Sequence, residues 1–131
     1  MWVEEGARIN ALSNKRRVVL IVEDEFLIRI NAVEMIEDSG FDVIEAGNAD
    51  EAIAILETRP DIHIVFTDIQ MPGSMDGLKL AHFVRHRWPP IKIVAVSGHH
   101  VFCDNDLPDG SLFLQKPYNS GQVAAALRQL I

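Results

Sequence analysis

The stretch Val65-Phe66-Thr67-Asp68-Ile69-Gln70-Met71-Pro72-Gly73-Ser74-Met75-Asp76-Gly77 decides the fold of this 131-residue chain. A mostly apolar run over residues 62–67 is typical of a buried strand, and Pro72 and Gly73 break the pattern soon after it. Asp68 therefore stands at the C-terminal tip of a strand. In open α/β sheets, ligands bind in the crevice outside the carboxyl ends of the strands. We therefore predict that Asp68 is the chemical centre of the protein.

The composition favours one domain that can bury its own core, because 48% of the residues are apolar. The formal net charge of −7 argues against a nucleic-acid partner, since affinity for phosphate backbones comes from clustered Lys and Arg. The apolar runs are far shorter than the roughly 20 residues that cross a bilayer, so we expect no membrane span. Cys103 is the one cysteine, which agrees with a reducing, cytoplasmic setting.

Apolar runs alternate with helical patterns along the chain. In the first predicted helix, apolar residues recur at helical spacing, and in the second, Asn48 is a plausible N-cap with Glu51 three positions on. The helix-spaced apolar residues of the first are Phe26, Ile30, Val33 and Ile36. The expected strands are residues 18–22, 41–45, 62–67, 91–96 and 112–114, and the expected helices are 26–38, 48–59, 78–88 and 120–131.

Strict alternation of strands and helices predicts a doubly wound α/β fold, with a five-stranded parallel sheet, helices on both faces and right-handed crossovers. Residues 99–110 are the least regular part, and we expect a short or irregular fourth helix there. Residues 1–17 read as a flexible N-terminal extension and residues 18–131 as one domain. We expect a stand-alone domain, because nothing remains after the last helix to form an output domain.

Polar residues converge at the predicted strand ends. Each has an ordinary explanation by itself: Ser97 could be a helix cap and Lys116 a solvated loop residue. Together they favour a functional site, because the carboxyl ends of parallel strands meet at one edge of the sheet. The converging residues are Glu23, Asp24, Asp68, Ser97 and Lys116.

The chemistry of this set points to a metal and a phosphoryl group. Crowded carboxylates repel unless a cation lies among them, and Mg²⁺ takes carboxylates and completes its shell with waters and phosphate oxygens. A carboxylate can also accept a phosphoryl group as an aspartyl phosphate. Asp68 fits the nucleophile, Lys116 the counter-charge and Ser97 the hydrogen-bond donor to a phosphoryl oxygen.

Four short runs resemble the signature of the receiver domain of two-component response regulators, and the similarity covers residues 18–131. The resemblance implies that Asp68 accepts a phosphoryl group from a sensor histidine kinase or a histidine phosphotransferase. It also implies the flavodoxin-like strand order 2-1-3-4-5. The runs are VEDE (22–25), TDIQMPG (67–73), VSG (96–98) and QKP (115–117).

The same resemblance implies roles for individual residues. Glu23, Asp24, Asp68 and the backbone carbonyl of Gln70 would hold Mg²⁺. Ser97 and Phe113 would form a switch pair that moves on phosphorylation and repacks the segment 99–110, and Lys116 would be the family's site lysine, often followed by a cis peptide. The protein would be a signalling switch with an unknown downstream target. The only reactions expected of it are its own phosphorylation and dephosphorylation.

Three features depart from the common pattern of that family. The loop between Asp68 and Gly77 is longer, the segment from Ser97 to Lys116 is shorter, and Phe113 stands where tyrosine is common. These departures leave open a second reading, a receiver-like protein-interaction module that acts without phosphorylation.

Two enzyme or cofactor classes fit less well. An aspartate-nucleophile phosphohydrolase needs a second acid two residues after the nucleophile, where this chain has Gln70. A flavin-binding protein needs a phosphate-binding loop after the first strand, where this chain has the acidic residues 23–25.

Overall fold

The apolar runs of the sequence form five parallel strands in one sheet. The computed structural model describes residues 16–98 and 106–131 of the chain. The strand order is β2-β1-β3-β4-β5, which confirms the predicted flavodoxin-like order. The strands are β1 (Val18–Val22), β2 (Asp42–Ala46), β3 (Ile62–Asp68), β4 (Lys92–Ser97) and β5 (Leu112–Gln115).

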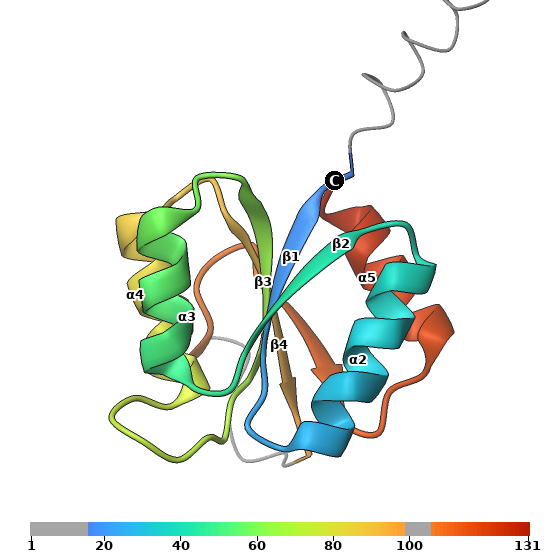
Figure 1. Cartoon of the computed structure of the whole chain (residues 1–131), viewed down its shortest axis with the longest axis horizontal. Coiled ribbons are helices and arrows are strands. Elements are labelled where there is room, and N and C mark those ends of the chain that lie inside the picture. Colours follow the sequence, from blue (N-terminus) through green and yellow to red (C-terminus); the bar gives the residue numbers. More distant parts are fainter. Residues whose placement is uncertain (1–15, 99–105) are drawn as a thin grey trace, which may run out of the picture.

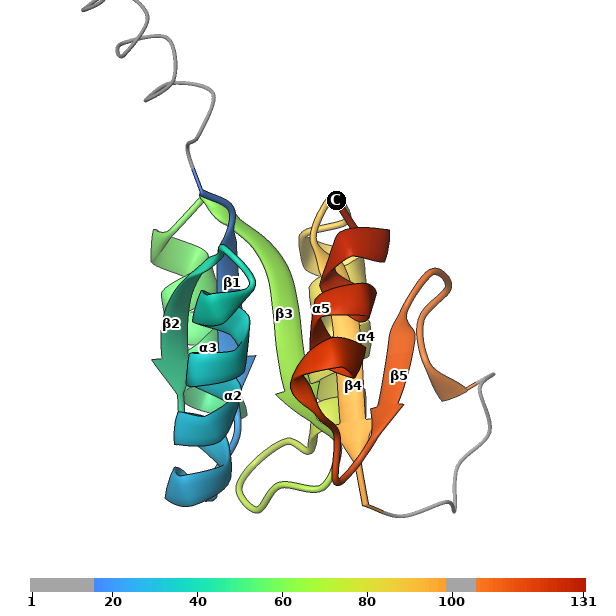
Figure 2. The same ribbon diagram turned by 90° about the vertical axis from the view of Figure 1, so that its right-hand side faces the viewer.

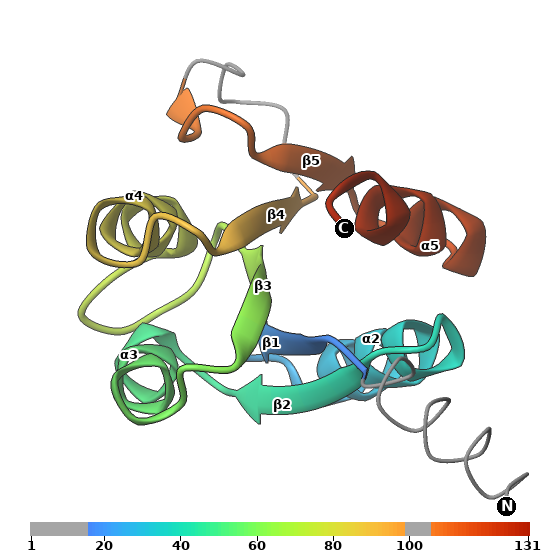
Figure 3. The same ribbon diagram turned by 90° about the horizontal axis from the view of Figure 1, so that it is seen from above.

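Helices cover both faces of this sheet, as the alternating pattern predicted. Figure 3 shows α3 and α4 over one face and α2 and α5 over the other. Among the described residues, no helix is long and apolar enough to span a bilayer. The helices are α2 (Phe26–Asp38), α3 (Ala49–Thr58), α4 (Gly77–Arg87) and α5 (Ser120–Gln129).

The inner strand β1 is buried along its whole length, and its side chains contribute to both of the core layers that the sheet separates. Successive side chains of a strand point to opposite faces. Leu20 therefore packs with the α3 and α4 layer, whereas Ile21 packs with Ile36 and Leu127 in the α2 and α5 layer. Burial of each such side chain stabilises the fold by about 1.5–3 kcal/mol. The position of β1 in the sheet is therefore strongly specified.

The predicted first helix is present as α2, but the helix-spaced apolar residues do not all lie on its buried face. Ala32 and Ile36 are buried, whereas Phe26 is 60% exposed and Ile30 is 42% exposed. Helix α2 starts beside the carboxyl ends of the strands (Figure 2), so its first turns have little of the sheet beneath them. The apolar period thus predicted the helix, and the structure shows which of its apolar residues are buried.

Side-chain caps begin helices α3 and α4, and the sequence predicted the cap of α3. The side chain of Asn48 accepts a hydrogen bond from the Glu51 N–H at 2.9 Å. The side chain of Asp76 likewise accepts one from the Lys79 N–H at 2.9 Å. These caps satisfy donors that a helix leaves unpaired at its N-terminus.

The connection from β4 to β5 is described only in part. Residues 106–111 contain no α-helix, and residues 99–105 of the predicted irregular helix lie outside the described residues. Leu107 is buried against Ala95 and Phe113. The ring of His82 on α4 donates from Nε2 to the Asp106 carbonyl at 2.6 Å. This part of the connection is therefore held against α4 and β4.

The predicted N-terminal extension is also described only at its end, because residues 1–15 lie outside the described residues. The Arg17 carbonyl accepts a hydrogen bond from the Asp42 N–H at 2.9 Å, and the Arg16 guanidinium donates to the Gly40 carbonyl at 3.1 Å. Both arginines thus contact the start of β2.

Gly77 lets α4 begin directly against the end of β3. Its N–H donates to the Ile69 carbonyl at 2.8 Å, which closes the loop of residues 70–76. A Cβ atom at this position would fall on the Asp68 carbonyl and lie 2.8 Å from the Ile69 Cα. Backbone atoms cannot move aside as a side chain can. Only glycine fits here without displacing Asp68.

We predict that Gly77→Ala lowers the free energy of unfolding by about 1–3 kcal/mol or more, because the added methyl group overpacks against backbone. Gly98→Ala is the matched control, since a Cβ there would meet only the Lys116 Cβ at 3.9 Å. It should stay within about 1 kcal/mol of the unmodified protein. Urea denaturation of the three proteins measures both effects, and equal midpoints would contradict the prediction.

Candidate functional site

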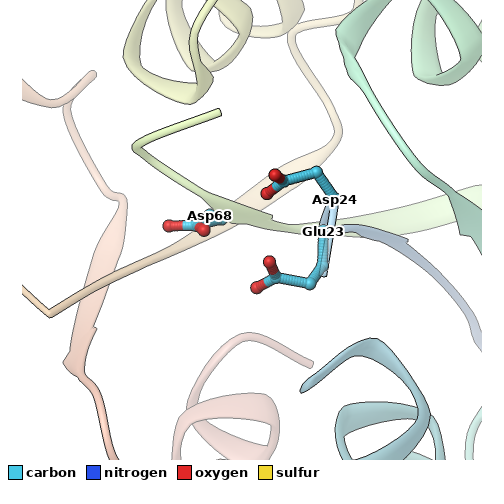
Figure 4. A group of neighbouring side chains, drawn as sticks. All are labelled: Glu23, Asp24 and Asp68. Atoms are coloured by element: carbon cyan, nitrogen blue, oxygen red, sulfur yellow. The ribbon is translucent and has the colours of Figure 1, made fainter. Parts of the chain in front are cut away.

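Two neighbouring strands deliver three carboxylates to one edge of the sheet. Asp68 is the last residue of β3, and Glu23 and Asp24 follow β1 directly. The Glu23 N–H still bonds the Ala46 carbonyl of β2 at 3.1 Å, so the backbone keeps its place in the sheet here. Carboxylate oxygens of the three residues lie within 4.8 Å of one another (Figure 4). The sequence predicted this cluster.

Lys116 places a cation among these acids. It follows β5, and its backbone N–H donates to the Ser97 carbonyl at 2.9 Å. Its Nζ lies 3.0 Å from Glu23 Oε1 and 3.0 Å from Asp68 Oδ2. Burial alone would lower the pKa of the Lys116 ammonium, but the hydrogen bonds to Asp68 and Glu23 outweigh it and raise that pKa. Lys116 is therefore held in its charged form.

Burial makes the ionised form of Glu23 less favourable. Its side chain is almost completely buried, and burial raises its pKa despite the hydrogen bonds from Lys116 and from the Glu25 N–H. The nearby Asp68 charge acts in the same direction. A further cation close to this carboxylate would stabilise the ionised form.

The donor set fits a hard divalent cation. Three carboxylates and one ammonium group leave a net charge of −2 at the site when all four are ionised. Mg²⁺ prefers oxygen ligands and is commonly held by one or two carboxylates. Asp24 is exposed at the rim, whereas Glu23 and Asp68 are buried. The cluster thus has both an inner wall and an opening to solvent.

Ser97 is the last residue of β4, beside the strand that carries Asp68. It is completely buried, and its Oγ donates a hydrogen bond to the Gln70 Oε1 at 2.8 Å. The Gln70 N–H donates to Asp68 Oδ1 at 3.3 Å. Ser97, the predicted hydroxyl donor, is thus linked through Gln70, a predicted metal ligand, to the carboxylate of Asp68.

Phe113 lies near this group but further back on the sheet. It pairs with Ala95 in the β4–β5 register, and Ala95 and Ser97 share one face of β4. Its ring is half-buried and packs against Ile69 and Leu107. The two predicted switch residues therefore lie on the same face of neighbouring strands.

Arg29 of α2 is a site residue that the sequence reasoning missed. Its Nη1 donates to the Glu23 carbonyl at 2.8 Å, and its Nε donates to Glu45 Oε1 at 3.0 Å. It therefore fixes the backbone that carries two of the carboxylates. An arginine shortly after an acidic pair is only a weak sequence signal, because its other partner, Glu45, comes from the separate strand β2. The hydrogen bond between Gln70 and Ser97 was also missed, because it too joins residues far apart in the sequence.

The peptide bond between Lys116 and Pro117 is cis. The resemblance had implied a cis bond at this place.

Comparison with known proteins identifies the family. The sequence model of the response regulator receiver domain matches residues 19–128. The sensor kinase CckA of Brucella abortus (strain 2308) is 35% identical over 117 residues, which are 86% of this chain and 12% of that protein. A putative response regulator, NtrX-like, of Rickettsia bellii (strain RML369-C) is 32% identical over 115 residues, which are 85% of this chain and 24% of that protein. The chain thus spans less than a quarter of the length of both relatives.

Solved structures agree. A response regulator receiver protein from Sinorhizobium medicae WSM419 has a TM-score of 0.80 at 31% identity, covering 88% of this chain and 94% of that one. The receiver domain of the hybrid histidine kinase CckA has a TM-score of 0.71 at 29% identity, covering 86% and 97%.

We predict that Glu23→Gln stabilises the protein at pH 7 when divalent ions are removed with a chelator. Folding raises the Glu23 pKa above its ordinary value of 4.5, so the unmodified protein loses stability as pH rises through the folded-state pKa. Glutamine does not titrate. The gain should therefore be present above that pKa and disappear below pH 4.5.

Asp61→Asn is the control of opposite sign for this experiment. The hydrogen bond from Arg59 lowers the Asp61 pKa, so removal of that charge should slightly reduce stability at pH 7. Urea denaturation at several pH values measures both variants. A Glu23→Gln protein that is less stable than the unmodified protein at pH 7 without divalent ions would contradict the prediction.

Proposed function

Because the chain belongs to the family of response regulator receiver domains, we propose that it is a phosphoacceptor switch that takes a phosphoryl group onto Asp68 from a phosphohistidine donor. The observation that carries the proposal is the pairing of Asp68 with Lys116 inside a cluster of three carboxylates. A buried acid that is paired with a lysine inside an acidic cluster has few structural uses, and the arrangement suits phosphoryl transfer.

In the proposed reaction, a carboxylate oxygen of Asp68 attacks the phosphorus atom of the donor. An O–P bond forms, and the P–N bond to the donor histidine breaks, with its electron pair passing to the histidine nitrogen. Lys116, 3.0 Å from Asp68 Oδ2, holds the carboxylate in place and balances the charge on the phosphoryl oxygens.

Glu23, Asp24, Asp68 and the backbone carbonyl of Gln70 would hold Mg²⁺ in this proposal. When bound, the ion supplies positive charge that offsets the negative charge on the transferring phosphoryl group. Arg29 supports this ligand set indirectly, because it holds the Glu23 carbonyl and thereby the turn that presents Asp24.

The new phosphoryl oxygens attract the Ser97 hydroxyl in the next step. Movement of Ser97 changes the packing on its face of β4, where Phe113 lies against Ile69 and Leu107. Phosphorylation would then shift the population between two arrangements of these side chains. A downstream protein would recognise one of the two arrangements.

The donor would dock on the exposed apolar side chains of α2. Phe26, Leu27 and Ile30 are exposed at the end of α2 that adjoins the acidic residues. A groove of about 360 Å³ also lies along α2, lined by Ile28, Asn31, Met35, Lys116, Pro117 and Tyr118. A donor histidine that reaches Asp68 must come close to this surface, so the patch suits a protein partner.

The first experiment tests phosphorylation itself. Incubated with acetyl phosphate and Mg²⁺, the unmodified protein should gain one phosphoryl group in its intact mass, and Asp68→Asn should gain none. Asp109→Asn is the control, because this exposed aspartate is remote from the carboxylate cluster. An unmodified protein that never gains a phosphoryl group would instead support the interaction module that acts without phosphorylation.

The second experiment separates docking from chemistry. The phosphodonor is a histidine protein that phosphorylates the unmodified chain. Leu27→Glu should slow this phosphotransfer by about tenfold or more, because burial of one leucine contributes about 1.5–3 kcal/mol. The rate with acetyl phosphate should stay the same. Ile131→Glu is the control, since Ile131 is also exposed but lies at the C-terminus, at the other end of the sheet (Figure 1). Equal slowing with both donors would contradict a docking role.

A further inference from the structure

The hydroxyl group of Ser97 is already engaged before any phosphoryl group is present. Ser97 is completely buried, and its Oγ donates to the Gln70 Oε1 at 2.8 Å. The contact joins two elements, because Ser97 ends β4 and Gln70 stands in the loop between β3 and α4. Gln70 is exposed, so the hydrogen bond links a surface side chain to a buried hydroxyl.

Both partners of this hydrogen bond are held by their backbones. The Ser97 carbonyl accepts from the Lys116 N–H at 2.9 Å, and the Gln70 N–H donates to Asp68 Oδ1 at 3.3 Å. The loop that carries Gln70 is anchored further on, where the Ser74 hydroxyl donates to Asp50 Oδ1 at 2.8 Å. The contact is thus part of a fixed frame around Asp68.

A serine hydroxyl carries a single hydrogen, and a glutamine carbonyl oxygen only accepts. In the proposed reaction, the same hydrogen must be donated to a phosphoryl oxygen on Asp68. The two hydrogen bonds therefore exclude each other. We propose that the Gln70 side chain is a positioning residue that holds the Ser97 hydroxyl in the unphosphorylated state and competes with the phosphoryl group for it.

This inference rests on the proposed phosphoacceptor function. It assigns a role to the side chain of Gln70, whereas the proposed metal site uses only its backbone carbonyl. The exchange favours the phosphoryl group, because a hydrogen bond to a charged acceptor is stronger than one to a neutral amide. Loss of the hydrogen bond to Gln70 nevertheless reduces the net free energy gained when Ser97 binds the phosphoryl group. Gln70 thereby sets how strongly a phosphoryl group on Asp68 attracts the Ser97 hydroxyl. It hence sets the fraction of phosphorylated molecules in which Ser97 has moved.

The test compares four proteins: the unmodified chain, Gln70→Met, Ser97→Ala and the double variant. Methionine keeps the length of the side chain but lacks the acceptor oxygen. The measured quantity is the dissociation constant for beryllofluoride with Mg²⁺, followed by amide NMR shifts around Asp68. Beryllofluoride occupies the position of a phosphoryl group on a carboxylate.

Gln70→Met should tighten beryllofluoride binding about threefold to tenfold when Ser97 is present, the factor for one neutral hydrogen bond. It should have no effect in the Ser97→Ala background, since the shared hydrogen is gone. The magnesium affinity of each of the four proteins is measured without beryllofluoride as well, so that the effect of a substitution on Mg²⁺ binding is separated from its effect on beryllofluoride binding.

The inference would be overturned if Gln70→Met changed the beryllofluoride affinity equally with Ser97 and with Ser97→Ala. It would also be overturned if Gln70→Met weakened beryllofluoride binding, or if a change in magnesium affinity accounted for the whole change in beryllofluoride affinity. An unmodified protein that fails to bind beryllofluoride would overturn the proposed function and this inference with it. The two kinds of failure are therefore distinguishable.

Discussion

The site depends on one ammonium group that lies between two buried carboxylates. Lys116 Nζ is 3.0 Å from Glu23 Oε1 and 3.0 Å from Asp68 Oδ2. Lys116 follows β5, Glu23 follows β1, and Asp68 is the last residue of β3. Buried carboxylates at close range destabilise a fold unless a cation accompanies them. The lysine meets part of that need and leaves a net charge of −2 with Asp24. The fold thus tolerates a cluster that still attracts a divalent cation.

The backbone around the cluster is held from several sides. Arg29 fixes the Glu23 carbonyl, the Gly77 N–H closes the β3–α4 loop on Ile69, and Ser74 ties that loop to Asp50 of α3. The long loop, which raised the possibility of an altered site, therefore returns to the sheet and keeps Gln70 beside Asp68. Precise placement of this kind matters for phosphoryl transfer, where positioning and charge do most of the chemistry.

Local sequence patterns predicted the strands and helices well, but they did not predict which side chains are exposed. Asn48 begins a helix as expected, because a cap is a contact between residues three positions apart. The exposure of Phe26 and Ile30 was not foreseen, because it depends on where α2 begins relative to the sheet. A helical period shows which residues share a face but not what lies opposite that face.

The sequence by itself determined the alternation of strands and helices, the caps, and the polar residues that stand at strand ends. These features follow from periods of two and 3.6 residues and from turn residues, which act over a few positions. Only the tertiary structure decided that Arg29 would bind the Glu23 carbonyl, that Gln70 would accept from Ser97, and that a side chain at position 77 would collide with Asp68. Each of these depends on the distance between separate elements, which packing of the whole sheet sets and no local pattern encodes.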